Sequence, residues 1–308
     1  MALISGEKTF RALYGEKVNP QDKLKAALEL NETPESVEVA LRTLKDMLGS
    51  VQNLNACLDD DYLLFFLRAR KFDIDRAFSL LQNFYGYRAQ YPELLQNSSQ
   101  VEALLRNGLY YHLPYRDEEG RAISVLNISS WDPDVYSFWD MAAAIMLSSE
   151  SILWFDPVTQ INGIVNICDV QGFSKKIFLE MSSPRKLSVF STILTNSNPA
   201  RVSTILVINT PQLVETLWTL VKPLIPKKFG DRVHFLGSDM KDLHQFLDPA
   251  ILPQEYGGKL PSRDYQKFVQ LVRDREDYTN YVRQFGFVKT EETEVTEKYT
   301  KLNEDDIW

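Results

Sequence analysis

The order of apolar and polar positions between residues 199 and 236 predicts a strand, a helix and a second strand. Residues 205–208 are a short apolar run rich in β-branched side chains, which is typical of a strand buried on both faces. Thr210 can cap the helix that follows, with Pro211 at its first position. That helix carries one continuous apolar arc, made up of Leu213, Val214, Leu217, Trp218, Leu220, Val221, Leu224 and Ile225. The alternation in 232–236 predicts the second strand, so we expect a parallel pair with a right-handed crossover.

Residues 21–90 have the pattern of a small helical bundle. Thr33-Pro34-Glu35 is a helix-start signal, and the acidic residues 59–61 stand where they favour the dipole of a second helix. Asp75 is expected to cap a third helix. We expect this bundle to support the main domain.

From about residue 108 strands alternate with helices. Strands are expected at 122–127 and 161–170, a long apolar helix over about 132–155, and a further helix at 184–194. Such alternation is typical of a mainly parallel sheet with helices packed on it. The expected fold class is therefore α/β, with an N-terminal helical bundle followed by a domain with a mainly parallel sheet and flanking helices.

These patterns divide the chain into four segments. Residues 1–20 are an N-terminal arm, 21–95 a helical domain and 96–285 the α/β domain. Residues 286–308 are polar and acidic with little to bury, so a flexible tail is expected there.

Composition and charge exclude several classes of protein. The chain of 308 residues has a formal net charge of -8, whereas a general nucleic-acid binder would be dominated by basic residues. Cys57 and Cys168 are far apart and lack metal spacing, which argues against disulfides and a zinc site. The sequence has no signal-peptide core and no apolar run near the ~20 residues of a membrane span. We expect a cytoplasmic monomer with no nucleic-acid partner, metal or cofactor.

Catalytic motifs are scarce. The sequence has no nucleophile elbow, dinucleotide fingerprint or P-loop, and its histidines have no nucleophile at a diagnostic spacing. Asp169 ends a buried strand, a position that often carries chemistry in α/β enzymes, but a capping carboxylate is the favoured interpretation. We therefore expect a protein that is not an enzyme.

Five sequence blocks, taken in order, carry a resemblance to a known family. They are DDDYLLFFLRARKFDIDRAFSLL at 59–81, GRAISVLNISSWDP at 120–133, NGIVNICDVQG at 162–172, NPARVSTILVINTPQLVETLWTLVKP at 198–223 and LPQEYGG at 252–258. Their order and spacing resemble the CRAL-TRIO lipid-binding family over roughly residues 20–285.

The resemblance implies a sheet that encloses a cavity for one hydrophobic molecule, with the helix at 211–226 as a mobile lid. It places a set of side chains against that ligand: Ile145, Ser149, Ile164, Cys168, Ile193, Leu194, Ile205 and Leu217. Leu213, Trp218 and Val221 would face the ligand or a membrane when the lid moves. Ser149 either orients a polar head group of the ligand or bonds back to its own helix.

A basic cluster surrounds the ends of this lid in an otherwise acidic chain. The resemblance implies phosphate contacts from Arg68, Arg201, Lys228 and Arg232, and the same cluster includes Lys222 and Lys227. We expect attraction to an anionic membrane or to phosphoinositide head groups. Ser203 replaces an arginine of another family member. General anionic attraction and specific phosphoinositide recognition are therefore both open.

The favoured function is intracellular binding and membrane-to-membrane transfer of a small tocopherol-, retinoid- or carotenoid-like lipid, with lid opening at anionic membranes. The expected localisation is cytoplasmic, with transient membrane association. The alternative is a membrane-associated regulatory or scaffold module that senses phosphoinositides or phospholipids. An enzyme acting on a hydrophobic substrate is the third class.

Overall fold

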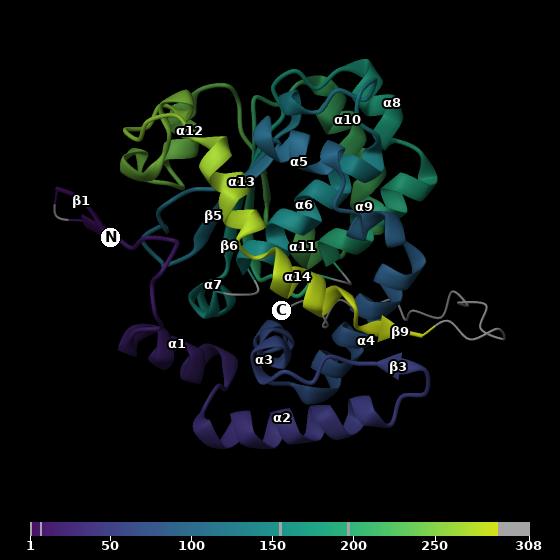
Figure 1. Ribbon diagram of the computed structural model, residues 1–308. Helices are drawn as coiled ribbons and strands as arrows, with labels where there is room; N and C mark the ends of the chain where they lie inside the picture. The colour runs from purple at the N-terminus through teal and green to yellow at the C-terminus, as the bar shows by residue number, and fades with distance from the viewer. Residues whose placement is uncertain (1, 7, 154–155, 196–197, 289–308) are drawn as a thin grey trace.

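A computed structural model describes residues 2–6, 8–153, 156–195 and 198–288 (Figure 1). Its central element is a sheet in the order β4-β5-β6-β7-β8, with bounds Tyr110–His112, Ala122–Asn127, Ile164–Asp169, Val202–Ile208 and Val233–Phe235. The first pair of strands is antiparallel and the other three pairs are parallel. The α/β class with a mainly parallel sheet is therefore confirmed.

The helices of the α/β domain cover this sheet and close its ends. They are α5 (Ser99–Arg106), α6 (Phe138–Leu153), α7 (Pro157–Asn162), α8 (Lys175–Met181), α9 (Pro184–Thr195), α10 (Gln212–Val221), α11 (Lys227–Gly230), α12 (Met240–His244), α13 (Tyr265–Arg273) and α14 (Glu276–Arg283). Short 3-10 helices are η1 (Pro92–Leu95), η2 (Ile128–Ser130), η3 (Lys222–Leu224), η4 (Pro249–Ile251) and η5 (Gln254–Tyr256).

The helical domain consists of α1 (Pro20–Leu30), α2 (Pro34–Gly49), α3 (Asp60–Ala69) and α4 (Ile74–Gln90), which lie together at one end of the molecule in Figure 1. Thr33 caps α2 in a reciprocal box with Ser36, as its helix-start signal predicts. The predicted cap of α4 was wrong by two residues: Asp73 is the cap, and Asp75 lies inside the first turn. Asp73 is the cap because its carboxylate accepts a hydrogen bond from the backbone N–H of Arg76.

Two other helix starts differ from the sequence pattern. The helix expected from about 132 begins only at Phe138, because Ser137 and Asp140 form reciprocal cap hydrogen bonds. Residues 132–136 form a turn, in which two backbone N–H groups donate to the carbonyl of Asp132. Pro211 is the cap of α10 and makes no side-chain cap bond, while the Thr210 hydroxyl donates to the carbonyls of Val207 and Leu236.

Both ends of the described chain are tied into the fold. The N-terminal arm contains the hairpin of β1 (Leu3–Ser5) and β2 (Lys8–Phe10). Phe10, at the end of β2, and Leu13 are buried in the main core. At the other end β9 (Gly286–Phe287) pairs antiparallel with β3 (Leu54–Asn55), beside α4 (Figure 1). Residues 286–287, which we expected in the tail, therefore belong to the fold, and 289–308 lie outside the described residues.

Candidate functional site

One face of the sheet, here called the inner face, looks toward α6 and α10. Ser148 of α6 lies with its Oγ 3.5 Å from Nε2 of His112, and the ring of Trp218 on α10 contacts that of Phe235. Side chains alternate along strands, and paired residues of neighbouring strands share a face. The register therefore places these residues on the inner face: Tyr110, His112, Ala122, Ser124, Leu126, Ile164, Asn166, Cys168, Ile205, Val207, Val233 and Phe235.

The structure brings together most of the side chains that the resemblance assigned to a ligand. Ile164, Cys168 and Ile205 lie on the inner face of two neighbouring strands. Ile145 and Ser149 lie one turn apart on α6, and Leu217 is buried on α10. Ile193 and Leu194 fall on α9, with side chains outside the described part of the chain.

Cys168 shows that the inner face keeps accessible surface deep in the domain. It lies on the middle strand of the sheet, and its side chain is only half-buried. Burial nevertheless raises the pKa of its thiol to about 12, as expected where little water solvates the thiolate. Ile145, Ser149 and Asn166 are also half-buried. The accessible surface of Cys168 therefore lies among protein groups rather than in bulk solvent.

A polar network that no sequence motif marks crosses the inner face. His112 Nδ1 lies 2.7 Å from the Ser124 hydroxyl, and burial lowers the pKa of His112 to about 3, which keeps the ring neutral. Burial raises the pKa of Tyr110, while hydrogen bonding with Ser124 and Ser149 opposes the rise. The signal available in the sequence was the alternation of polar residues within strands that are otherwise apolar.

Helix α10 splits its apolar arc between the interior and the surface. Val214, Leu217 and Val221 are buried, and Leu213 and Trp218 are half-buried against the main core. Leu220 is 44% exposed, and Leu224 in η3 is 48% exposed. The predicted apolar arc is therefore only partly buried, because the helix is covered by protein on one side and leaves Leu220 and Leu224 on the surface.

The basic residues expected to bind phosphate divide into two groups. Lys222, Lys227 and Lys228 are exposed in η3 and α11, which follow α10 directly. The arginines are engaged with protein oxygens. Arg68 forms an ion pair with Glu32 at 2.6 Å and bonds Gln160, Arg201 donates to the carbonyl of Ile161, and Arg232 to that of Val202.

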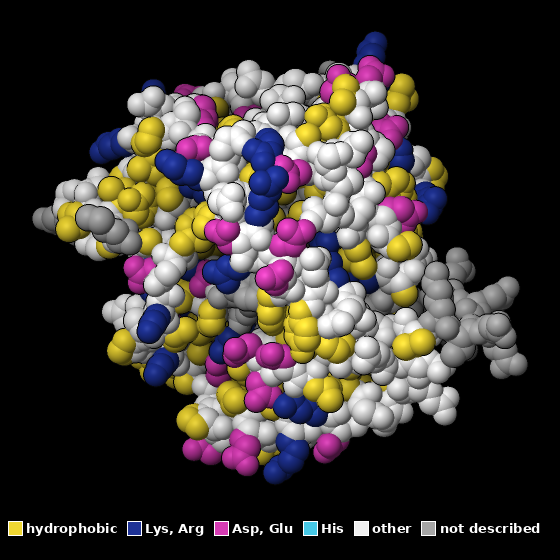
Figure 2. Space-filling view, viewed as in Figure 1, with side chains coloured by type: hydrophobic (Ala, Val, Ile, Leu, Met, Phe, Trp, Pro, Cys, Tyr) yellow, Lys and Arg dark blue, Asp and Glu magenta, His cyan; other side chains and the backbone are white. Residues whose placement is uncertain are grey.

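Burial lowers the pKa of both Arg201 and Arg232. Ser203, between them in sequence, donates to the carbonyl of Ile164. The face shown in Figure 2 carries acidic and basic side chains interspersed, without one dominant basic patch.

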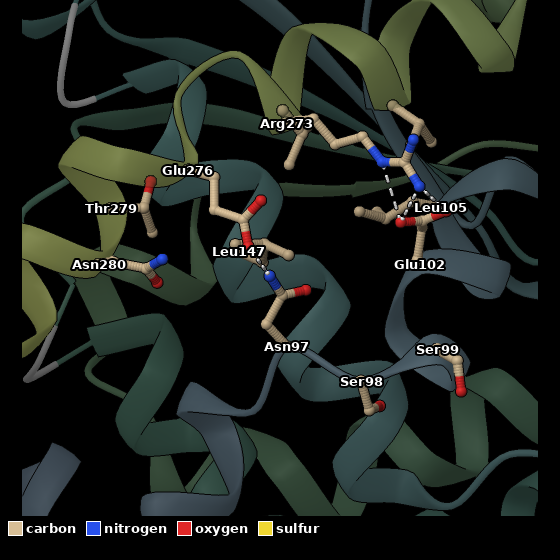
Figure 3. A pocket seen from close by; sticks show the side chains of 12 residues that line it. Asn97, Ser98, Ser99, Glu102, Leu105, Leu147, Arg273, Glu276, Thr279 and Asn280 are labelled. Carbon is tan, nitrogen blue, oxygen red and sulfur yellow. Dashed lines mark hydrogen bonds and ion pairs between the residues drawn. The ribbon is translucent and has the colours of Figure 1, made fainter.

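A polar pocket of about 470 Å³ lies apart from the inner face, among α5, α6, α13 and α14 (Figure 3). Glu102 and Arg273 form an ion pair of 2.7 Å on one side of it, and Asn97 donates to Glu276. Leu147, on α6, lies at its floor. Glu102 and Arg273 therefore neutralise each other within this pocket.

The described residues contain no group of three or more His, Cys, Asp or Glu side chains that could hold a metal ion. In the same part of the chain, no helix combines the length and the apolar character needed to cross a membrane.

Comparisons with known proteins agree with this geometry. A family model described as "CRAL/TRIO domain" matches residues 106–258, and one described as "Pinta-like, UBA domain" matches 33–100. The chain is 33% identical to clavesin-2 of Mus musculus over 264 residues, which cover 84% of this chain and 80% of the relative. It is 34% identical to clavesin-1 of Pongo abelii over 273 residues, covering 85% and 77%.

A third relative is the "Alpha-tocopherol transfer protein-like" protein of Pongo abelii, 33% identical over 264 residues, which cover 85% of this chain and 76% of the relative. Among solved structures, that of Sfh5 matches with a TM-score of 0.53 at 14% identity, covering 87% of this chain and 98% of the other. This last likeness concerns the fold alone.

Proposed function

Because the chain belongs to the CRAL/TRIO domain family, we propose that it binds one small hydrophobic lipid between the inner face and α10 and transfers it between membranes. The observation that carries the proposal is the half-buried Cys168 on the middle strand, whose thiol is nonetheless shielded from water. A well-packed protein leaves little accessible surface at such a position. A lipid would fill the space beside Cys168, Ile145 and Ser149.

Helix α10 serves as the lid in this proposal. Its buried side chains Val214, Leu217 and Val221 would meet the lipid or water when the helix moves. Exposing an apolar side chain of this size costs roughly 1.5 to 3 kcal/mol, so opening into water is unfavourable by several kcal/mol. A membrane interface would offset that cost, which links opening to membrane contact.

The outer side of the lid has the chemistry of a membrane-docking surface. Leu220 and Leu224 are exposed there, and Leu179 on the neighbouring helix α8 is 70% exposed. Lys222 lies between Leu220 and Leu224, Lys227 and Lys228 follow them, and these lysines would attract anionic lipid head groups. We assign the docking surface to these leucines and lysines, in a cytoplasmic monomer that touches membranes transiently.

The arginines would act differently from the lysines. Arg68, Arg201 and Arg232 already bond protein oxygens, so a phosphoinositide head group would have to compete for them. General attraction to anionic membranes is thus better supported than recognition of one phosphoinositide. No chemical transformation of the lipid is part of the proposal.

The experiment is mass spectrometry of the organic extract from purified protein, followed by transfer of the recovered lipid between donor and acceptor vesicles. We expect about one lipid per chain and faster transfer with anionic acceptor vesicles. A protein that carries no lipid and accelerates no transfer, yet binds vesicles, would refute the proposal and support a membrane-associated regulatory or scaffold module.

A further inference from the structure

Asn166 occupies the centre of the inner face. It lies on the middle strand β6, paired with Ser124 of β5 on one side and with Ile205 of β7 on the other. Ile164 and Cys168 stand two residues away on the same face. The side chain of Asn166 therefore projects toward the space in which the lipid is proposed to lie.

The carboxamide oxygen of Asn166 is unsatisfied. Its Oδ1 is buried and accepts no hydrogen bond from any described residue. Buried polar groups in proteins are almost always hydrogen-bonded, because a buried group without a partner destabilises the fold. Asn166 is half-buried, so part of its side chain is still accessible beside Cys168. A turn of the carboxamide about the Cβ–Cγ bond would bring Oδ1 to this accessible side, where a molecule held against the face can supply the missing donor.

The neighbouring polar groups are already engaged. The hydroxyl of Ser124 pairs with His112, and Tyr110 bonds with Ser124 and Ser149. These groups bond one another, and among the described strand positions of the inner face Asn166 is the one whose buried side-chain oxygen lacks a donor. A ligand that supplied one would remove the deficit without disturbing the network.

The inner face carries no charge that could pair with an ionised ligand. None of its positions in the five strands is Lys, Arg, Asp or Glu, and His112 is neutral. A carboxylate or phosphate placed here would be a buried charge without a partner, which is strongly unfavourable. The polar group of the ligand is therefore uncharged.

From these observations we infer that the lipid is a neutral alcohol whose hydroxyl hydrogen-bonds the carboxamide of Asn166. A hydroxyl donates and accepts, so it can satisfy either end of the carboxamide as the side chain turns. Hydrocarbons, ethers and esters lack the donor, and fatty acids carry a charge. The inference rests on the proposed lipid-binding function and names the class of lipid.

The test uses matched pairs that differ only in the hydroxyl: retinol, cholesterol and α-tocopherol, each with its methyl ether, together with retinoic acid. Purified full-length protein is incubated with this mixture, and the retained lipids are quantified by mass spectrometry. In whichever pair the cavity accepts, we expect the alcohol to exceed its ether by roughly tenfold, the effect of one hydrogen bond. Retinoic acid should be retained less than retinol.

Two variants assign the effect to Asn166. Asn166→Leu keeps the size of the side chain and should retain alcohol and ether about equally. Asn107→Leu, the same change at an exposed position outside the sheet, should keep the wild-type ratio. The wild-type ratio needs no variant, so the test remains decisive if the Asn166→Leu protein does not fold.

The outcomes separate this inference from the function on which it rests. Equal retention of alcohol and ether by the wild-type protein, or preference for the acid, overturns the inference and leaves lipid binding standing. A full alcohol preference in folded Asn166→Leu also overturns it. Retention of none of these lipids, with none recovered from the purified protein, refutes the proposed function and the inference together.

Discussion

The ring of Trp218 on α10 meets the ring of Phe235 on β8 nearly edge-on, with centroids 5.6 Å apart and an interplanar angle of 61°. This contact joins the proposed lid to the edge strand of the sheet. An aromatic pair of this geometry contributes about 0.5 to 1.5 kcal/mol beyond its area burial. If α10 acts as the proposed lid, the pair stabilises its closed position.

Replacement of Phe235 by alanine should speed release of the lipid. Loss of the aromatic contact favours the open lid by about 1 kcal/mol, so we expect roughly a 3- to 10-fold faster transfer between vesicles. Stopped-flow transfer of a fluorescent lipid measures the rate. Phe246→Ala, which removes an outer ring packed on His234, is the control and should leave the rate unchanged. Equal rates for wild type and Phe235→Ala would argue against α10 as the gate.

Charged residues at Leu220 and Leu224 should weaken membrane binding without unfolding the protein. Both side chains lie on the surface, 44% and 48% exposed, so Leu220→Glu with Leu224→Glu should change the free energy of unfolding by less than about 0.5 kcal/mol. Loss of two inserted leucines should lower vesicle partitioning by at least roughly tenfold. Flotation with vesicles measures this. Leu28→Glu, at a leucine 74% exposed on α1, is the matched control and should float like wild type.

Reversal of Lys228 to glutamate should reduce binding to anionic vesicles and leave binding to neutral vesicles unchanged. A basic side chain near an anionic surface contributes about 1 kcal/mol, and reversal adds repulsion, so a loss of at least fivefold is expected at low salt. The loss should shrink as salt rises. Lys23→Glu, at an exposed lysine of α1, is the control. A loss of the same size in both variants would mean that only net charge matters.

Arg68 should contribute more to the stability of the fold than to phosphate binding. Its ion pair with Glu32 has side chains only 10% and 15% exposed, and removal of one partner of such a pair is strongly destabilising. We expect Arg68→Ala to lower the free energy of unfolding by about 3 kcal/mol, measured by urea denaturation. Lys45→Ala, which breaks the more exposed pair with Asp60, should cost less than about 1 kcal/mol. A small effect at Arg68 would leave it free for a ligand role.

His112 should make stability fall with decreasing pH. Its pKa is lowered to about 3 in the folded protein, from an ordinary value of about 6.5. Between these values the unfolded chain binds a proton that the folded protein does not. The free energy of unfolding should therefore fall by up to about 1.4 kcal/mol per pH unit below about pH 6.5.

The variant His112→Gln lacks this titration, so its unfolding free energy should approach that of wild type as the pH is lowered from 7 toward 5 (about the range in which the unfolded histidine gains its proton). Urea denaturation at several pH values gives the two curves. Curves that stay parallel would show that His112 does not contribute this dependence.

Local sequence patterns were sufficient to predict the bounds of elements whose apolar periodicity and flanking cap residues lie next to one another in the chain. Strand β5 runs over residues 122–127 as expected, and α9 begins at Pro184 as expected. The sequence missed β3 and β9, because each has two residues and exists only through pairing with the other end of the chain. It also misplaced the start of α6, where two competing cap signals lie within a few residues.

The sequence by itself determined the α/β class, the family and the amphipathic character of α10, because alternation, caps and helical spacing are set by neighbouring residues. Tertiary structure decided which of the basic residues are engaged, since Arg68 meets partners 36 and 92 positions away. It also decided which side chains share the inner face. Periodicity places Asn166 on the same face as Cys168, but only the strand register sets Asn166 beside Ser124 and Ile205. There the side-chain oxygen Oδ1 of Asn166 has no hydrogen-bond donor among the described residues.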